Sequence, residues 1–349
     1  MASAEVVLPV PALDRPVLAD EFTASGYRLR PGTWWGLRPL AVGIVCGALL
    51  FYVADAIGPF SILLAGVTAL YTATGIKWLR SSGAERRATT ELLSTTAWRP
   101  ARVEVLSTRK RRCVVEVVTE EQTFCLALVM YPAHRAVLRR SGRAWVVGPD
   151  CKGIAAVRIE GSFEAWPARL VAGRPEPMPV SARETADPTV QWAGIVRQGI
   201  VRLVIPLLAP LVAFGLVLDR LGHVDLPLDL VGAAAALVVG AAMLWPHRRL
   251  PAQWRLRGLL DVGEWTRATA TVDRCTPNRV GVRDAVVTAR LPEGGTVTLA
   301  LAQVGMDLPN TVTATGALWI KGAPRPGGRV AVGFPGYPMV TVARVLGPA

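Results

Sequence analysis

Histidine, a frequent acid–base catalyst and metal ligand, is scarce in this chain. The chain has three histidines, His134, His223 and His247, and they fall in different predicted elements. Because a metal centre needs ligands that converge, the sequence argues against a shared metal site. It also lacks Gly-x-Ser-x-Gly, Walker and dinucleotide-binding motifs. We therefore predict no enzymatic activity, no catalytic residue, no metal and no cofactor, and we expect the histidines to be solvated surface or interface residues.

A disulfide framework is missing as well. The five cysteines are odd in number, lack Cys-x-x-Cys spacing and are not shared between the two halves described below, which favours free thiols in a reducing compartment. Cys113 and Cys125 fall on adjacent predicted strands. A turn at Glu120-Glu121 would place Cys113 opposite Leu128, so we expect two buried apolar residues rather than a redox pair.

Acidic residues are scarce relative to basic ones, and the net charge is +13. The densest basic cluster is Arg109, Lys110, Arg111 and Arg112, in the predicted turn between two strands. Such a cluster can hold anionic head groups at about 1 kcal/mol per residue. It can also contact the phosphates of nucleic acid, but without accompanying aromatic residues this partner is disfavoured. We interpret the cluster as a candidate anionic-lipid contact on a solvated turn.

Charge is absent from several long segments. Sixteen uncharged residues separate Arg38 from Asp55 and twenty-one separate Asp55 from Lys77. Apolar segments follow near 199–218, where Arg202 lies close to one end, and near 230–245. Together with a mean hydropathy of +0.36, these segments predict four transmembrane helices in two hairpins. Basic residues flank the hairpins, so both termini and both polar regions are expected in the cytoplasm of a multi-pass plasma-membrane protein.

The same pattern occurs twice, 167 residues apart. An apolar hairpin is followed in both halves by a Leu-Leu-x4-Trp signature, at Leu92, Leu93 and Trp98 and again at Leu259, Leu260 and Trp265. In each copy two tryptophans lie twenty residues apart at the same place relative to the apolar run, Trp78 and Trp98 and then Trp245 and Trp265, which is hard to obtain by chance. We infer a tandem duplication.

Short alternating segments rich in Val and Thr follow each hairpin and predict six strands per copy. In the first copy they are Ala101–Leu106, Cys113–Thr119, Thr123–Leu128, Ala144–Val147, Ile154–Ile159 and Arg169–Val171. In the second they are Thr266–Asp273, Val280–Leu291, Thr296–Ala302, Ala317–Lys321, Gly328–Phe334 and Met339–Val345. A helix is expected at Pro132–Ser141, and Trp145 and Trp319 mark equivalent strands. Six short strands predict a small barrel or sandwich.

The predicted fold class is thus an α+β membrane protein with two transmembrane hairpins, each followed by a small cytoplasmic antiparallel β-barrel or sandwich. The predicted boundaries are an N-terminal cytoplasmic arm, disordered or loosely attached, at 1–36, a hairpin at 37–80, a β domain at 88–172, a linker at 173–190, a second hairpin at 196–247 and a second β domain at 255–349.

A hairpin joined to a Val/Thr-rich barrel that ends in Gly-x-x-Val-x-Val-x-x-Pro-Gly, loosely matched by Gly327 to Gly336, resembles uncharacterised actinobacterial multi-pass membrane proteins. More distantly it is similar to membrane-anchored NfeD-like barrels, one barrel at a time. The first copy has Glu160-Gly161 in place of the Pro-Gly turn. Neither resemblance implies a catalytic motif.

Small residues at helix-packing spacing lie in the apolar segments at Gly43, Gly47, Gly232, Ala236 and Gly240. They indicate packing within one four-helix bundle, with homo-oligomerisation as the alternative. The leading functional hypothesis is a non-enzymatic scaffold or regulatory protein in the lipid bilayer that engages a protein partner through its β domains. The alternatives are a small transporter or channel component and a membrane-tethered enzyme.

Overall fold

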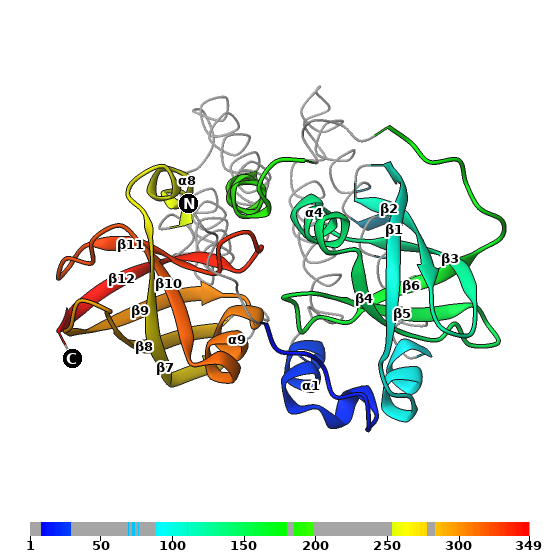
Figure 1. Cartoon of the computed structure of the whole chain (residues 1–349), viewed down its shortest axis with the longest axis horizontal. Helices are drawn as coiled ribbons and strands as arrows, with labels where there is room; N and C mark the ends of the chain where they lie inside the picture. The colour runs from blue at the N-terminus through cyan, green and yellow to red at the C-terminus, as the bar shows by residue number, and fades with distance from the viewer. Residues whose placement is uncertain are drawn as a thin grey trace, which may run out of the picture. The chain divides into compact units, whose positions relative to one another are not determined.

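The computed structural model describes residues 8–28, 69, 72, 73, 76, 88–109, 111–179, 185–198, 253–277 and 283–348 (Figure 1). Nearly all of them belong to one compact unit, formed by Met1–Arg30, Glu85–Arg197 and Ala252–Ala349. This unit contains two β-barrels, and both barrels contribute to the contacts described below.

The predicted transmembrane helices are corrected by the structure. Among the described residues, no helix is long and apolar enough to cross a membrane. Of the predicted hairpins at 37–80 and 196–247, all but a few residues lie outside the described ranges, including Gly43, Gly47, Gly232, Ala236 and Gly240. The predicted α+β membrane fold class is therefore corrected to two closed β-barrels with short helices, and the predicted multi-pass plasma-membrane location is not supported. Uncharged composition alone does not determine what a segment packs against.

The first β domain is a closed antiparallel barrel in the order β1-β2-β3-β6-β5-β4. Its strands are β1 (Arg99–Arg109), β2 (Arg112–Val118), β3 (Thr123–Val129), β4 (Arg143–Val147), β5 (Ile154–Ile159) and β6 (Trp166–Val171). In β2, Cys113, Val115 and Val117 are buried while the alternate residues are more exposed, as expected for a strand with one face toward a core. The predicted alternation thus does produce a barrel.

The second β domain repeats this topology, in the order β7-β8-β9-β12-β11-β10. Its strands are β7 (Trp265–Pro277), β8 (Arg283–Arg290), β9 (Thr296–Val304), β10 (Ala317–Lys321), β11 (Arg329–Gly333) and β12 (Val340–Pro348). Bulges occur at equivalent places, between Val105 and Ser107 and between Val272 and Arg274. The predicted internal repeat is confirmed at the level of strand order.

Each barrel has a helix between its third and fourth strands. The predicted helix Pro132–Ser141 is α4, and the second barrel has α9 (Asp307–Thr315), which the sequence did not indicate. Both helices end at a left-handed glycine, Gly142 (φ 60°) and Gly316 (φ 62°), a conformation that favours glycine because it has no Cβ. The carbonyl of each glycine then accepts a bond from the first strand of its barrel, at Val103 and Ala270.

Two segments outside the barrels pack against them. Residues 8–28, expected to be loose, include the short helix η1 (Val17–Ala19) and α1 (Glu21–Arg28), and Val17 is buried with Trp98 beside the first barrel. Residues 188–198 are helical, and their Ala193 packs with α8 (Leu256–Leu260) against the second barrel. In both segments an aspartate caps the helix. Asp20 accepts a hydrogen bond from the Thr23 N–H, and Asp187 accepts one from the Thr189 N–H. The two aspartates are 167 residues apart, which is the offset of the repeat.

Candidate functional site

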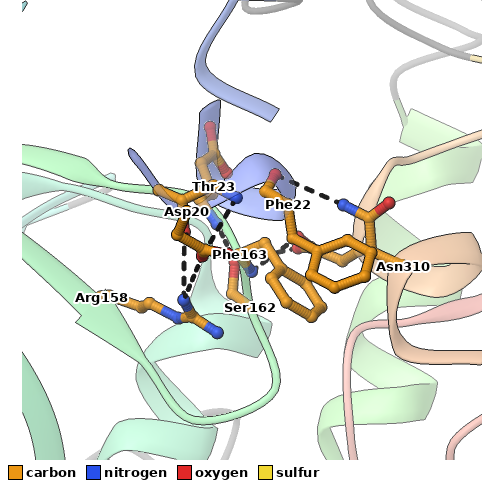
Figure 2. A network of polar contacts seen from close by, with 9 residues as sticks. Asp20, Phe22, Thr23, Arg158, Ser162, Phe163 and Asn310 are labelled. Carbon is orange, nitrogen blue, oxygen red and sulfur yellow. Dashed lines mark hydrogen bonds and ion pairs between the residues drawn. The ribbon is translucent and has the colours of Figure 1, made fainter. Parts of the chain in front are cut away.

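A partly buried network of polar contacts lies between the barrels. The Asp307 carboxylate, at the start of α9, accepts hydrogen bonds from the Ser162 hydroxyl at 2.9 Å and the Phe163 N–H at 2.8 Å. Ser162 and Phe163 belong to the β5–β6 loop of the first barrel, shown from close by in Figure 2. A loop of one barrel is thus held by a helix of the other.

Arg158 connects this loop to the N-terminal segment. Its side chain is only 2% exposed, its Nη1 donates to the Thr23 hydroxyl at 3.1 Å, and Asp20 lies 3.6 Å away (Figure 2). The guanidinium also stacks over the Phe163 ring at 4.7 Å. Burial lowers the pKa of Arg158 to about 10, although Asp20 and Asp307 favour its charged form. Arg158 therefore stays charged at neutral pH.

Asp307 is the most strongly perturbed carboxyl group of this network. Burial, followed by the charge of Glu164, raises its pKa to about 6, while the Phe163 and Ser162 hydrogen bonds and Arg158 oppose the shift. Its titration therefore falls near physiological pH and is coupled to contact between the two barrels.

A second loop makes the reciprocal contact. Tyr337, in the β11–β12 loop of the second barrel, donates its hydroxyl to Glu160 at 2.8 Å, and the Arg140 guanidinium of α4 lies 4.7 Å from its ring centre. Burial and the Glu160 bond raise the pKa of Tyr337 to about 12. Gly161 has a positive φ of 76°, and a Cβ there would lie 2.6 Å from Tyr337 Cδ1, so glycine is required by both backbone and space.

The sequence predicted a solvated surface or interface position for His134, but the structure buries this residue, which is only 3% exposed. Its ring lies 5.0 Å from that of Trp166 and 5.5 Å from that of Trp192, and Tyr131 completes the cluster. Burial lowers the pKa of His134 to about 3, which keeps the imidazole neutral. Since Trp192 comes from residues 188–198, this aromatic cluster fastens the second helical segment to α4 of the first barrel.

We call these contacts together the interbarrel joint. In it, the loop at residues 160–165 contacts α9 and the loop at residues 334–339 contacts α4. The joint also includes the helical segments within residues 8–28 and 188–198. Each segment packs on the barrel of its own copy and touches the helix of the other copy, since the Phe22 carbonyl accepts from Asn310 of α9. Val137 of α4 is also buried in the core cluster of the second barrel. The joint therefore makes one unit of two barrels.

The predicted basic cluster lies elsewhere, on the outside of the first barrel. Arg109 ends β1, Arg112 begins β2 directly opposite it, and Arg111 stacks over Tyr131 at 4.7 Å, whereas Lys110 lies outside the described residues. Of these four residues, Arg109 and Arg112 line a surface hollow of about 440 Å³, together with Arg169 of β6. Arg169 was not among the predicted site residues.

Strand register explains why the arginines converge. One row across the outer face runs Ser107, Val114, Ala127 and Arg169, and the next runs Arg109, Arg112 and Val129. Because side chains of paired residues project to the same face, the hollow is floored by small apolar groups with basic groups around it. We call these residues, with Cys113, Leu128 and Pro167, the arginine-lined hollow. Sequence spacing could not reveal the hollow, because Arg169 is brought near Arg109 and Arg112 by the pairing of β3 with β6.

The equivalent face of the second barrel has different chemistry. Thr276 stands opposite Asp284 where Arg109 stands opposite Arg112. Arg344 pairs with Ala300 as Arg169 pairs with Ala127, and Arg274 stands at the place of Ser107. The second barrel thus has two exposed arginines on this face, together with Asp284. The duplication thus preserved the barrel but not the arrangement of charged side chains on this face.

The remaining predicted sites have separate outcomes. Cys113 does pair with Leu128, and Cys125 is also buried; burial raises the pKa of the Cys125 thiol, which keeps it protonated. Within the described ranges, no group of three His, Cys, Asp or Glu residues is arranged to hold a metal ion. His223 and His247 lie outside them. In comparisons with known proteins, no family model, characterised protein or solved structure matches this chain.

Proposed function

We propose that the two-barrel unit is a non-catalytic interaction module that engages an acidic protein partner through the outer face of the first barrel. The observation that carries this proposal is the arginine-lined hollow: three basic side chains from three strands around an apolar floor, present in one copy only. A basic face with a recessed apolar centre is suited to a partner that supplies negative charge.

The interbarrel joint supports a role in presentation. The Phe163–Asp307 hydrogen bond and the Arg140–Tyr337 contact fix a loop of each barrel on a helix of the other. The Arg158–Asp20 ion pair and the His134–Trp192 contact hold the two helical segments. Polar groups that are this deeply buried contribute to a single arrangement only when they are satisfied by partners. The strongly shifted groups, Asp307 and Arg158, are engaged in these contacts rather than exposed in the hollow.

Closure of the barrels limits how a partner can bind. Every strand in the two described sheets has a neighbour on both sides, so neither barrel offers an edge for strand addition. Side chains on outer faces and loops remain for recognition, and the hollow is such a face.

The test uses a photo-crosslinking amino acid at Val129, which is 53% exposed and lines the hollow, and at Ala302, the matching position on β9. In cells that make the full chain, the Val129 probe should capture a defined acidic protein that the Ala302 probe does not. Capture should disappear in Arg109→Thr with Arg112→Asp, which gives the first barrel the residues of the second. Identical captures from both positions, or capture unchanged by the double substitution, would contradict the proposal.

A further inference from the structure

We propose that the arginine-lined hollow binds a phosphomonoester carried on a side chain of the protein partner. This inference rests on the proposed function and specifies the group that the hollow recognises. Three features of the hollow carry it: the number and register of its arginines, the repulsion between two of them, and the chemistry of its walls.

The register directs three guanidinium groups toward one hollow. Arg109 and Arg112 occupy directly paired positions, and Arg169 lies on the far side of β3, beside Ala127. A phosphomonoester carries three strongly accepting oxygens, and planar guanidinium groups bind such oxygens in pairs. Lysine would supply only a point charge, so arginine at all three positions indicates a phosphate-like rather than a purely electrostatic partner.

Two of these arginines repel one another in the absence of a ligand. Like charges directly opposite across an antiparallel pair destabilise a sheet, and Arg109 faces Arg112 in this way. The second barrel avoids the repulsion, because Thr276 faces Asp284 at the same place. A dianion bound between Arg109 and Arg112 would attract both guanidinium groups and so offset their mutual repulsion. The unneutralised repulsion between these arginines is thus consistent with a site for an anionic ligand.

The walls of the hollow narrow the class of ligand. Its volume of about 440 Å³ exceeds what a lone ion needs and falls within the usual range for small-ligand sites. The described lining includes Val114, Ala127, Val129 and Pro167 beside the Ser107 hydroxyl, but no acidic and no aromatic residue. Without an aromatic platform a nucleobase has nothing to stack on, which disfavours nucleotides and nucleic acid. A phosphorylated side chain flanked by small apolar residues fits better.

The direct experiment is isothermal titration of the full chain with the peptide Ala-phosphoserine-Ala and with Ala-Ser-Ala, at pH 7.5 and fixed ionic strength. The phosphorylated peptide should bind at least about tenfold more tightly, because charge-assisted bidentate bonds are lost without the phosphate. Arg169→Ala, and separately Arg109→Thr with Arg112→Asp, should remove this preference. Arg344→Ala, the matched arginine of the second barrel, should leave it unchanged.

A pH series provides an independent readout. The second pKa of a phosphomonoester is about 6, so affinity for the phosphopeptide should rise between pH 5.5 and 7.5 while arginines stay charged. Inorganic sulfate is a dianion throughout and should show no such rise. Transfer of the site offers a gain-of-function test: Thr276→Arg with Asp284→Arg should create a second phosphopeptide site beside Arg344.

Several results would overturn the inference. These are equal affinity for the two peptides, loss of preference in Arg344→Ala, or hollow-dependent binding of phosphoinositide vesicles with no binding of the phosphopeptide. If the peptides bind equally while the Val129 probe still captures its partner in an arginine-dependent way, the interaction module stands and only the phosphate assignment fails.

Discussion

The two barrels have the same backbone topology but different side chains on the outer face. Strand order, bulge position and the glycine that ends the connecting helix recur in both copies. The outer faces differ: Arg109 and Arg112 in the first barrel correspond to Thr276 and Asp284 in the second. Interior and turn positions are constrained by burial and backbone conformation, whereas exposed positions can diverge at little cost in stability. The two copies therefore agree in backbone and interior but differ in the charge of one outer face.

The largest expected effect tests whether the two cores are equivalent. Leu126 on β3 and Leu299 on β9 occupy matching positions, and neither is exposed. Leu126→Ala and Leu299→Ala should each lower the free energy of unfolding by about 2–5 kcal/mol, through lost burial and the cavity left behind. Urea unfolding followed by tryptophan fluorescence measures both. If one variant is indistinguishable from the parent chain, the cores are not equivalent.

An intermediate effect is expected at the interbarrel joint, where the two copies also differ. Asp307 begins α9, whereas Ala133 occupies the matching position in α4, 174 residues earlier. The folded-state pKa of Asp307 is about 6, above its ordinary 3.8. Its protonation therefore stabilises the folded state fully below pH 3.8, and this stabilisation is lost as pH rises through 6. The total is about 3 kcal/mol at 1.36 kcal/mol per pKa unit.

Asp307→Asn should remove that dependence, since an amide does not titrate. The measurement is the difference in unfolding free energy between the parent chain and the variant from pH 4 to pH 7.5. We expect the parent to lose stability relative to Asp307→Asn as pH rises. A difference that stays constant across this range would show that Asp307 does not titrate in the joint.

The smallest effect concerns an ion pair of the first barrel, at whose positions the described part of the second barrel has Thr271 and Thr288 in place of Glu104 and Glu116. Arg174 reaches Glu116 at 3.0 Å and Glu104 at 3.9 Å, and its side chain is 57% exposed. Arg174→Ala should cost less than about 1 kcal/mol, because exposed ion pairs are screened by water and salt. The same urea unfolding measurement applies, with Arg102→Ala as a neighbouring surface control on β1. A loss as large as that of Leu126→Ala would mean that Arg174 anchors the segment after β6.

Local patterns were sufficient to predict the repeated unit. Period-two alternation located all twelve strands, and the Glu120-Glu121 turn set the Cys113–Leu128 pairing correctly. The helix α9 was missed because Leu-Pro-Asn-Thr-Val-Thr has low helix propensity. Its threonines bond back to carbonyls four residues earlier, as Thr311 does to Asp307, so tertiary position rather than propensity makes this segment helical.

The joint and the hollow could not be predicted in the same way. Ser162 and Asp307 are 145 residues apart, and neither stands in a recognisable motif. His134 was expected at a surface because one histidine without ligand-spaced neighbours usually lies there, yet an aromatic cluster from three segments encloses it. The transmembrane prediction failed for a related reason, since hydropathy measures avoidance of water and does not identify the packing partner.

By itself, the sequence determined that one block was copied, that each copy contains six short strands, and where their turns fall. These features are local, since side-chain alternation and glycine conformation act over a few residues. Only the tertiary structure decided that the strands close into barrels, that loops of each barrel fasten to helices of the other, and that Arg169 joins Arg109 and Arg112. Those outcomes depend on pairings between residues far apart in the chain, which local patterns do not encode.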